Sequence, residues 1–565
     1  MYSGNNIFGK SNYKTGIGKR IWIMMIIFML FFCLLIWKIS NKMYFKAEPL
    51  KAMFNAQYTI DEKYGTPYKL LDCNGNNLLE YKMNYTAVID PVDYFRFNEY
   101  TSKYDMESLT ITLRNYNVNY DLDKIKGSGS FEKVRYKIDE ITFNKLKDIK
   151  GIKGFYTFAV NKVIEVKNWK IENLLSNPRD SENSKFKSAD SLEMQIYNKT
   201  KNNEYEKIRF VKGVDGDIGE GKIIYPQNNI NVRLTLDKEI QDSVENILHK
   251  KEYNKYEQIG VVLMESTTGK IRAMAQKDDT RYNANLGMVG TNGAYPGSIF
   301  KVIVEEAGLD LNLIDVNEKY KLNSELFKKE HSKGRDSYTV REALTYSSNN
   351  IFAQFGFLIG GKSIYNYAEK QGLLGKVLNF HDEESGKFEV ELLNSKFIAS
   401  DISQASIGQN IRITPLAAIS IPSTIINNGV YVNPSIIDSY VNDNNEIIES
   451  VAPKKSTILK RETAEEIKLA MMDVVTKGTG QQAYIEGMDI GGKTGTTEYN
   501  DDGEKCSDGW FVGFFKLNGK KYSMVVFVPK ILINVEGKDD EEGGTTAAPI
   551  FKEIVKALKK NGSNK

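Results

Sequence analysis

The strongest hydrophobic feature of the chain is an unbroken run of 17 apolar residues, Ile21–Trp37. This length is at the short end of what spans a bilayer, and Trp22 and Trp37 stand near the two ends, where interfacial anchors lie. The run is longer than the apolar core of a usual signal peptide, and no Ala-x-Ala cleavage site follows it. The pattern therefore predicts a single transmembrane anchor at residues 21–37. Basic residues are balanced on its two sides, so local charge does not decide its orientation.

Three later stretches combine apolar–polar alternation with turn residues, as β-hairpins do. They are Tyr68–Leu79 around an Asn-Gly turn, Ile259–Ala275 around Thr-Thr-Gly-Lys, and Trp510–Val528 around a second Asn-Gly turn. Asn-Gly is a dipeptide that two-residue hairpin turns favour.

Helical patterns separate the last two hairpins and flank them. Asp237 is placed to cap a helix whose residues Ile240, Val244, Ile247 and Leu248 share one face. Further helices are predicted at Ser298–Ala307, after Thr414, and from Pro549 to about Lys560. Helices between two separated hairpins predict an antiparallel sheet flanked by helices, which is an α+β fold.

Composition and charge exclude some classes of function. A chain of 565 residues is expected to hold two or three domains. Its net charge of +3 is too balanced to indicate nucleic-acid binding. The three cysteines and three histidines show no metal-ligand spacing, so a zinc hydrolase is not expected, and neither a metal ion nor another cofactor is predicted.

The first candidate for chemistry is the pair Ser298 and Lys301, three residues apart near the start of a predicted helix. Residues i and i+3 share a helix face, so the Lys301 amine can reach the Ser298 hydroxyl. A serine becomes a good nucleophile when a nearby base takes its proton, and a lysine can be that base if its pKa is lowered. Alone, the pair is weak evidence, because this pattern occurs by chance in most long chains.

Two further motifs follow in the chain, and the set of three is far more specific than any one of them. The first is a Ser-Ser-Asn-Asn stretch, which pairs either Ser347 with Asn349 or Ser348 with Asn350; the second is Lys493–Thr496, Lys-Thr-Gly-Thr. Ser-x-x-Lys, Ser-x-Asn and Lys-Thr-Gly in this order are the joint signature of penicillin-binding proteins and class A β-lactamases. The chain resembles the penicillin-binding transpeptidases, and more narrowly their monofunctional class B type. The pair Ser347 and Asn349 matches the Ser-Ser-Asn form of that family.

Other stretches support this resemblance and suggest domain limits. Leu234–Gln241 is similar to the start of the family's catalytic domain, and Ser406–Asn410 to its Gly-Gln turn. The resemblance implies a small mixed α/β dimerisation or pedestal domain at residues 45–230 and a penicillin-binding transpeptidase domain at residues 231–565. No Glu-Asp-x-x-Phe-x-x-His-x-Gly pattern is present, which argues against a glycosyltransferase domain and so against a bifunctional synthase.

The resemblance implies a role for each catalytic motif residue. Ser298 attacks the D-Ala-D-Ala end of a peptidoglycan stem peptide, and Lys301 accepts the serine proton. Ser347 relays a proton to the leaving amine, and Asn349 holds the substrate amide. Lys493 attracts the terminal carboxylate of the substrate and, as a neighbouring cation, lowers the pKa of Lys301.

The remaining motif residues are expected to bind substrate. Thr494 and Thr496 add hydroxyl groups for the carboxylate, and Gly495 lets backbone and substrate approach closely. The backbone N–H groups of Ser298 and Thr496 are expected to form the oxyanion hole. An amine of a neighbouring stem peptide then takes the acyl group, which makes a cross-link, and β-lactam antibiotics acylate the same serine.

The resemblance also implies a location and partners. The protein is expected to cross the bacterial plasma membrane once, with residues 1–20 as a cytoplasmic tail and the large domain on the extracytoplasmic face. A membrane glycosyltransferase of wall synthesis is a further expected partner. Whether the enzyme serves elongation, division or spore formation stays open.

Three alternatives share parts of this pattern. A β-lactamase uses the same motifs, but in Glu389–Asn394 the residue three before Leu393 is Val390, so the class A Glu-x-x-Leu-Asn loop is out of register. A β-lactam-sensing receptor should carry a cytoplasmic effector, and only about 20 residues precede the anchor. A β-lactam-resistant scaffold, which organises wall-synthesis partners through residues 45–230, is compatible with the motifs.

Overall fold

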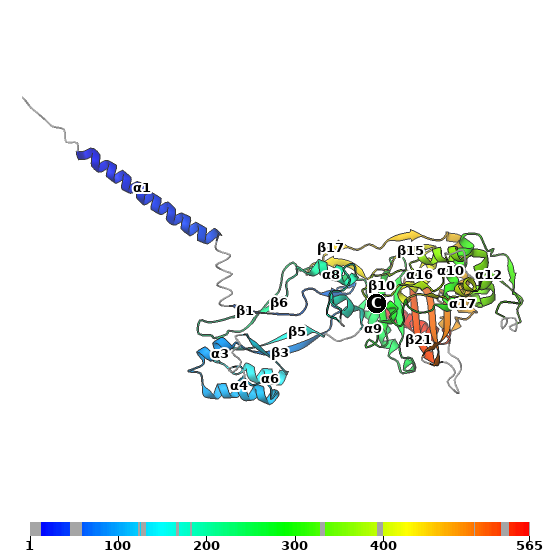
Figure 1. Ribbon diagram of the computed structural model, residues 1–565, viewed down its shortest axis with the longest axis horizontal. Helices are drawn as coiled ribbons and strands as arrows, with labels where there is room; N and C mark the ends of the chain where they lie inside the picture. Colours follow the sequence, from blue (N-terminus) through cyan, green and yellow to red (C-terminus); the bar gives the residue numbers. More distant parts are fainter. Residues whose placement is uncertain are drawn as a thin grey trace, which may run out of the picture. The chain divides into compact units, whose positions relative to one another are not determined.

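The computed structural model of the protein describes the chain in two compact units (Figure 1). Residues 13–45, 59–122, 125, 132–164, 169–180, 183–327, 334–392, 399–501, 503–532 and 542–563 are described. The first unit comprises Met1–Gly65, Met83–Lys162 and Glu206–Tyr225; the second comprises Thr66–Lys82, Val163–Tyr205 and Pro226–Lys565.

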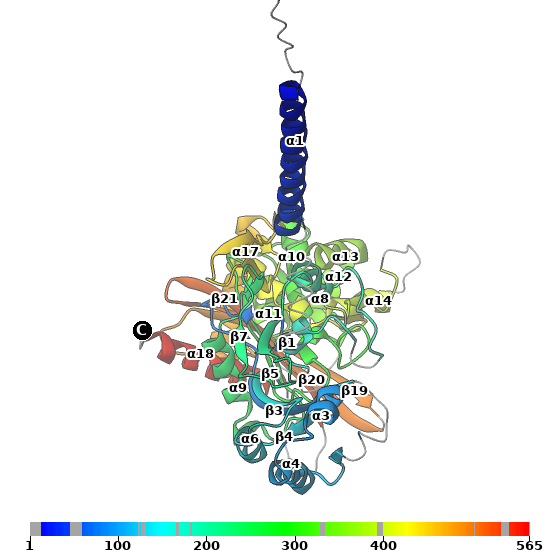
Figure 2. The same cartoon turned by 90° about the vertical axis from the view of Figure 1, so that its left-hand side faces the viewer.

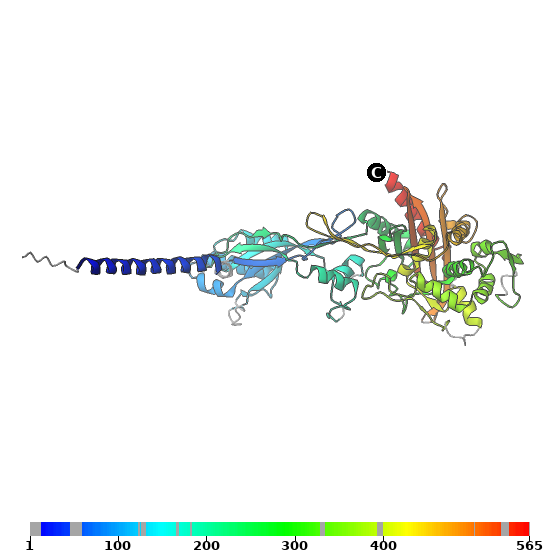
Figure 3. The ribbon, with the colours of Figure 1, turned by 90° about the horizontal axis from the view of Figure 1, so that it is seen from above.

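Helix α1 (Tyr13–Ser40) carries the long apolar run and continues into a π-helical turn, η1 (Asn41–Phe45) (Figure 3). Its part Lys19–Met43 has a mean hydropathy of 2.5 and is long and apolar enough to cross a membrane. The large apolar side chains of this part are exposed, as side chains facing lipid would be. The prediction of one apolar helix of spanning length is confirmed for the described part of the chain. The first twelve residues of the predicted tail lie outside the described residues.

Besides α1, the described part of the first unit contains two three-stranded sheets and three helices. One sheet has the strand order β1 (Thr59–Tyr64), β6 (Glu206–Val211), β7 (Lys222–Ile224), and the other β4 (Val134–Ile138), β3 (Tyr81–Ile89), β5 (Phe155–Val163). The helices are α3 (Pro91–Phe97), α4 (Lys103–Tyr116) and α6 (Glu140–Lys147). Strand β3 buries alternate residues in two cores, because Ala87 and Ile89 pack with Leu109 of α4 while Val88 packs with Phe210 of β6.

The second unit is built around a five-stranded sheet in which every neighbouring pair is antiparallel. Its strand order is β10 (Lys270–Gln276), β9 (Gly260–Glu265), β21 (Lys520–Leu532), β20 (Glu504–Leu517), β19 (Ile490–Asp501). The predicted hairpins β9–β10 and β20–β21 are both confirmed. Strand β19 lies at the edge, and it carries the Lys-Thr-Gly-Thr motif.

Helices cover both faces of this sheet, as the alternation of buried residues along β9 requires. Val262 and Met264 face a core shared with α10 (Lys301–Asp310), α12 (Asn349–Ile359), α16 (Ser420–Ile426) and α17 (Arg461–Thr476). Val261 and Leu263 face a second core shared with α9 (Lys238–Leu248) and α18 (Ala547–Ser563), which lie side by side (Figure 2). The predicted antiparallel sheet flanked by helices is confirmed.

Shorter elements complete the second unit. The helices are α7 (Ile171–Ser176), α8 (Leu192–Thr200), α11 (Val340–Thr345), α13 (Gly361–Lys370), α14 (Ala399–Ser406) and α15 (Pro415–Ala418), and the 3₁₀ turns are η2 (Lys251–Tyr253), η3 (Ala284–Leu286), η4 (Gly297–Phe300) and η6 (Gln481–Ala483). The two-stranded sheets are β11 (Lys319–Lys321) with β12 (Ser337–Thr339), β13 (Lys387–Phe388) with β14 (Ile411–Arg412), and β15 (Val430–Val432) with β18 (Lys455–Thr457); a four-stranded sheet has the order β17 (Ile447–Ser450), β16 (Ile437–Val441), β8 (Asn231–Leu234), β2 (Leu70–Leu71).

The hairpin predicted at Tyr68–Leu79 is present only in a short form. Leu71 and Asn77 form an isolated antiparallel bridge, and the Leu78 N–H donates to the Leu70 carbonyl oxygen, but residues 76–80 form no regular strand. The Asp72 carboxylate accepts hydrogen bonds from the N–H groups of Asn74 and Asn76, which closes a side-chain-stabilised loop instead of a two-residue turn. The first strand, β2, pairs in parallel with β8 of the same unit, where Leu70 is fully buried. Strand β2 therefore pairs with a distant strand, while a single bridge closes the local hairpin.

Candidate active site

Ser298 lies in the 3₁₀ turn η4, which leads directly into helix α10 at Lys301. A 3₁₀ turn brings residues i and i+3 into line along its axis, so the turn places Ser298 and Lys301 on the same side. Ser298 is half-buried, whereas Lys301 is completely buried.

Two glycines allow strand β19 to press against this turn. Gly297 has a φ of +54°, and a Cβ added there would lie 2.6 Å from the carbonyl oxygen of Thr496. A Cβ added to Gly495 would lie 2.5 Å from the carbonyl oxygen of Pro296. Side chains cannot occupy these positions without moving backbone, so glycine at both keeps Ser298 next to the Lys-Thr-Gly-Thr motif.

The Lys301 amine is held by residues of the Ser-Ser-Asn stretch. Its Nζ donates hydrogen bonds to Asn349 Oδ1 at 2.6 Å, to the Ser347 carbonyl oxygen at 2.8 Å and to Ser347 Oγ at 3.2 Å. It also lies 5.5 Å from the centre of the Phe352 ring. Three donated bonds correspond to the ammonium form, whereas a neutral amine would keep two of them and have a lone pair that can accept a proton.

Ser347 joins the two ends of the site. Its backbone is left-handed, with a φ of +58°, which is uncommon for a residue other than glycine or asparagine. Its hydroxyl also accepts a hydrogen bond of 2.9 Å from Lys493 Nζ. Lys493 is completely buried, and burial lowers the pKa of its amine from 10.5 to about 7.

The alternative pair in the Ser-Ser-Asn-Asn stretch lies elsewhere. Ser348 is the N-cap of α12, where its hydroxyl accepts the N–H of Ile351. Asn350 is buried and donates hydrogen bonds to the carbonyl oxygens of Asn323 and Leu326. The structure therefore brings Ser347 and Asn349, not Ser348 and Asn350, to the Lys301 amine.

Both threonines of the Lys-Thr-Gly-Thr motif have hydrogen-bond partners that the sequence analysis missed. The hydroxyls of Thr494 and Thr479 lie 2.7 Å apart, and the Gly543 N–H donates to Thr496 Oγ1 at 3.0 Å. Because the Thr496 oxygen accepts this bond, its own O–H is free to donate elsewhere. The available signal was a pair of glycine-rich turns, one around Thr479 and one at Gly543-Gly544.

Hydrogen bonds to a carboxylate and from an indole hold the segment that precedes Ser298. Tyr295 Oη donates to the Glu389 carboxylate at 2.8 Å, and Arg412 Nε donates to it at 2.7 Å. The Tyr295 carbonyl oxygen accepts a hydrogen bond of 3.0 Å from Trp510 Nε1. Burial opposes ionisation of Glu389, but the bonds from Arg412 and Tyr295 prevail and lower its pKa.

Comparison with known proteins identifies the family. The family model "Penicillin binding protein transpeptidase domain" matches residues 259–556, which is more than half of the chain. The chain is 27% identical over 365 residues to "Stage V sporulation protein D" of Bacillus subtilis, covering 59% of this chain and 54% of that protein. It is 26% identical over 350 residues to "Probable peptidoglycan D,D-transpeptidase PenA" of Neisseria gonorrhoeae, covering 58% and 57%. The chain thus spans a little over half the length of these curated relatives.

Solved structures agree on the fold. A peptidoglycan synthetase from Bifidobacterium adolescentis superposes with a TM-score of 0.61 at 19% identity, covering 89% of this chain and 96% of that one. Penicillin binding protein 3 of Mycobacterium tuberculosis, in complex with aztreonam, superposes with a TM-score of 0.59 at 16% identity, covering 89% and 97%. The chain belongs to the penicillin-binding protein transpeptidase family, as its three motifs predicted.

Proposed function

We propose that this protein is a monofunctional, class B peptidoglycan D,D-transpeptidase that cross-links stem peptides through a serine acyl-enzyme. The observation that carries the proposal is the arrangement around Ser347, whose hydroxyl accepts hydrogen bonds from both Lys301 and Lys493. In this proposal residues 231–565 are the catalytic domain and residues 45–230 the pedestal, although Thr66–Lys82 and Val163–Tyr205 belong to the same compact unit as the catalytic residues.

In the acylation step Ser298 Oγ attacks the carbonyl carbon of the penultimate D-Ala, and the neutral amine of Lys301 takes the hydroxyl proton. The acceptors Asn349 Oδ1 and Ser347 O then stabilise the ammonium that forms. The Ser347 oxygen accepts from two amines, so its own hydrogen points to a third partner. That partner is the leaving amine, which receives the proton as the peptide bond breaks and D-Ala departs. The Lys301 ammonium then returns its proton to the Ser347 oxygen, so that Lys301 is neutral again.

Lys493 and the motif threonines bind the carboxylate end of the donor. The Lys493 amine, with its pKa lowered to about 7 by burial, is only partly charged without substrate. A substrate carboxylate beside it favours the ammonium form. The Lys493 amine therefore becomes fully charged when the donor peptide is bound. Thr494 and Thr496 supply hydroxyl groups, and the backbone N–H groups of Ser298 and Thr496 stabilise the oxyanion. Loss of one such donor typically costs about 3–4 kcal/mol.

An amine of a neighbouring stem peptide then attacks the ester on Ser298. The new amide bond forms as the ester bond breaks, and the proton of the amine returns to the serine oxygen through Lys301. A β-lactam takes the place of the donor and leaves its opened ring on Ser298. The same site thus explains both cross-linking and acylation by penicillins.

The apolar helix α1 supports a single-pass anchor in the bacterial plasma membrane. Because peptidoglycan is assembled outside that membrane, the large domain lies on the extracytoplasmic face and residues 1–20 in the cytoplasm. The nascent glycan strands come from a membrane glycosyltransferase, which is the expected partner.

A β-lactamase is the second candidate, and Glu389 argues against it. A deacylating glutamate must be free to activate a water molecule, but the Glu389 carboxylate is held by Tyr295 and Arg412. Leu393 and Asn394, the other residues compared with the lactamase loop, lie outside the described residues. A β-lactam-resistant scaffold remains the alternative in which no acylation occurs.

Labelling of the full-length protein with a fluorescent penicillin tests the proposal. Intact mass is followed for several hours in detergent for the wild type, Ser298→Ala and Ser363→Ala, a serine on α13 outside the site. A persistent adduct on the wild type and Ser363→Ala, absent from Ser298→Ala, is expected. Rapid loss of the adduct with hydrolysed drug accumulating would indicate a β-lactamase. A folded wild type without adduct would overturn the serine acyl-enzyme for β-lactams and leave the scaffold.

A further inference from the structure

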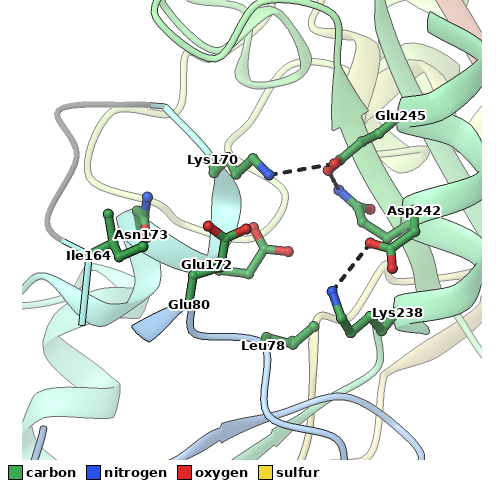
Figure 4. Close-up of a pocket in the computed structure, with 10 residues that line it drawn as sticks. Leu78, Glu80, Ile164, Lys170, Glu172, Asn173, Lys238, Asp242 and Glu245 are labelled. Atoms are coloured by element: carbon green, nitrogen blue, oxygen red, sulfur yellow. Dashed lines mark hydrogen bonds and ion pairs between the residues drawn. The ribbon is translucent and has the colours of Figure 1, made fainter. Parts of the chain in front are cut away.

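A small polar pocket lies in the second unit, between helices α7 and α9 and the loop after β2 (Figure 4). Its volume is about 100 Å³, and its lining shares no residue with the candidate active site. Leu78 and Ile164 supply apolar atoms, while most other lining residues are charged.

The charges that line the pocket are unbalanced. Lys170 Nζ lies 3.5 Å from Glu245, and Lys238 Nζ lies 3.3 Å from Asp242. Each lining lysine therefore faces a carboxylate of α9. Two further carboxylates, those of Glu80 and Glu172, point into the same space (Figure 4). Among the described residues that line the pocket, four acidic side chains thus share the space with two amines.

Glu172 is the most constrained of these acids. Only 8% of it is exposed, and its Oε2 accepts no hydrogen bond from the described residues. Burial raises the pKa of Glu172 to about 7, and the negative charge of Glu245 acts in the same direction. A buried carboxylate oxygen without a partner is costly, and a cationic donor in the pocket would remove that cost.

Asp279, a half-buried acid beside Lys170, adds negative charge next to the pocket. Asp279 lies 3.9 Å from Lys170, and burial raises its pKa to about 6. Lys170 therefore forms ion pairs with both Glu245 and Asp279. Its positive charge also lowers the pKa of Glu172. One amine among three carboxylates leaves net negative charge at the inner end of the pocket.

We propose that this pocket binds a primary ammonium group on a short aliphatic stem, with Glu172 and Glu80 as the receiving carboxylates. An ammonium carries three hydrogen-bond donors in a compact group. These donors suit the unpartnered Glu172 oxygen and the exposed carboxylate of Glu80. The stem would lie against Leu78 and Ile164. A volume of about 100 Å³ holds roughly three water molecules, so only a few non-hydrogen atoms enter.

A metal ion suits the pocket less well. Among the described residues, no group of three or more His, Cys, Asp or Glu side chains is arranged to hold one. Hard divalent cations take six or more oxygen ligands or several waters, whereas two carboxylates are enough for an ammonium. The ammonium has two possible sources, a free small amine or the lysine side chain of a peptide.

The test is binding of n-butylammonium to the full-length protein in detergent at pH 8 and constant ionic strength. Calorimetry and the thermal-unfolding midpoint are measured against n-butanol, a neutral analogue, and KCl. We expect saturable binding of butylammonium alone, weakened at least tenfold in Glu172→Gln and in Glu80→Gln. Binding should also weaken as the pH falls through about 7, because Glu172 then becomes protonated.

Controls separate the pocket from general charge effects. Glu257→Gln removes an exposed carboxylate, paired with Arg281 outside the pocket, and should bind like the wild type. The two pocket variants are isosteric, and Glu80 is exposed, so folding should be retained. N-acetyl-lysine amide tests the peptide source: saturable binding lost in the same variants assigns a lysine side chain as well, and binding of butylammonium alone assigns a free amine. No saturable binding to the wild type, or binding unchanged in both pocket variants, would overturn the proposal.

Discussion

Lys493 Nζ donates a hydrogen bond of 2.9 Å to Ser347 Oγ, which joins the edge strand β19 to the turn between α11 and α12. The same hydroxyl accepts from Lys301 Nζ at 3.2 Å. A hydroxyl oxygen has two lone pairs, so two amines saturate it and its single hydrogen is directed away from both. The site thus has an ordered proton donor between two lysines, and each of the three side chains can be tested separately.

Replacement of Lys301 by methionine removes the proposed base but keeps an unbranched, flexible side chain that is only one atom shorter. Loss of a positioned general base typically lowers a rate about 100- to 10,000-fold, so the second-order rate of acylation by penicillin should fall in that range. The measurement is stopped-flow or gel-based labelling against time. Lys362→Met, an exposed lysine on α13, is the matched control. An acylation rate within threefold of the wild type for Lys301→Met would contradict its role as the base.

Alanine substitutions at neighbouring serines separate catalysis from helix capping. Ser347→Ala removes the hydroxyl shared by the two lysines, so acylation should fall by at least tenfold with little loss of stability. Ser348→Ala removes the N-cap of α12, which typically costs about 1 kcal/mol. Its thermal midpoint should drop, while the folded protein is acylated at close to the wild-type rate. If Ser348→Ala slowed acylation and Ser347→Ala only lowered the thermal midpoint, Ser348 and not Ser347 would belong to the catalytic residues.

Local patterns were sufficient to predict much of this molecule. The apolar run, the hairpin turns and the Asp237 cap depend on residues close together in the chain. Asp237 does accept the N–H groups of Glu239 and Ile240 at the start of α9. The order of the three motifs was likewise enough to identify the family, because each motif is only a few residues long.

Non-local packing explains what the sequence did not reveal. The family resemblance already favoured Ser347 over Ser348, but no local rule predicts the left-handed backbone of Ser347. The partners of Thr494 and Thr496 come from Thr479 and Gly543, which only folding brings to β19. The hairpin after Leu71 is reduced to one bridge, and the other pairing of β2 is with a strand far along the chain.

Lys493 should make stability depend on pH in a defined direction. Burial lowers its pKa from 10.5 to about 7, so between these values the unfolded chain binds one proton more than the folded protein. Stability contributed by this group therefore rises from pH 7 towards pH 10.5 and is constant below pH 7. The thermal midpoint of the wild type minus that of Lys493→Met should increase between pH 7 and 9.5 and stay level between pH 5.5 and 6.5. A difference that does not change with pH would contradict a buried amine with this pKa.

Thr479 is expected to act through Thr494, whose hydroxyl it contacts at 2.7 Å. Thr479→Val keeps the shape and removes a hydrogen bond worth about 1 kcal/mol, so acylation by a carboxylate-bearing β-lactam should slow about fivefold. Thr479→Ser should restore the rate, because it restores the hydroxyl. Thr476→Val, which removes a hydroxyl bonded only to its own helix at Met472, is the control.

A double-mutant cycle decides whether Thr479 acts through its neighbour. If Thr479 positions Thr494, then Thr479→Val combined with Thr494→Val should cost little more than Thr494→Val alone. Fully additive losses would mean that the two hydroxyls act independently. No effect of Thr479→Val on acylation would show that the 2.7 Å contact is only structural.

Gly408→Ala should misplace Ser298 without touching any motif residue. Gly408 has a φ of +82°, and a Cβ added there would lie 1.9 Å from the carbonyl oxygen of Gly297, the residue before the serine. Gly519→Ala is a matched control, because Gly519 has a φ of +75° in the β20–β21 turn and an added Cβ meets no atom within 4 Å. Both variants force alanine into a left-handed conformation, at roughly 1–2 kcal/mol, but only Gly408→Ala also pushes on the backbone of the site. We therefore expect a modest fall in the thermal midpoint with normal acylation for Gly519→Ala. For Gly408→Ala we expect a larger fall and acylation reduced more than tenfold, and equal behaviour of the two variants would contradict the close approach at Gly297.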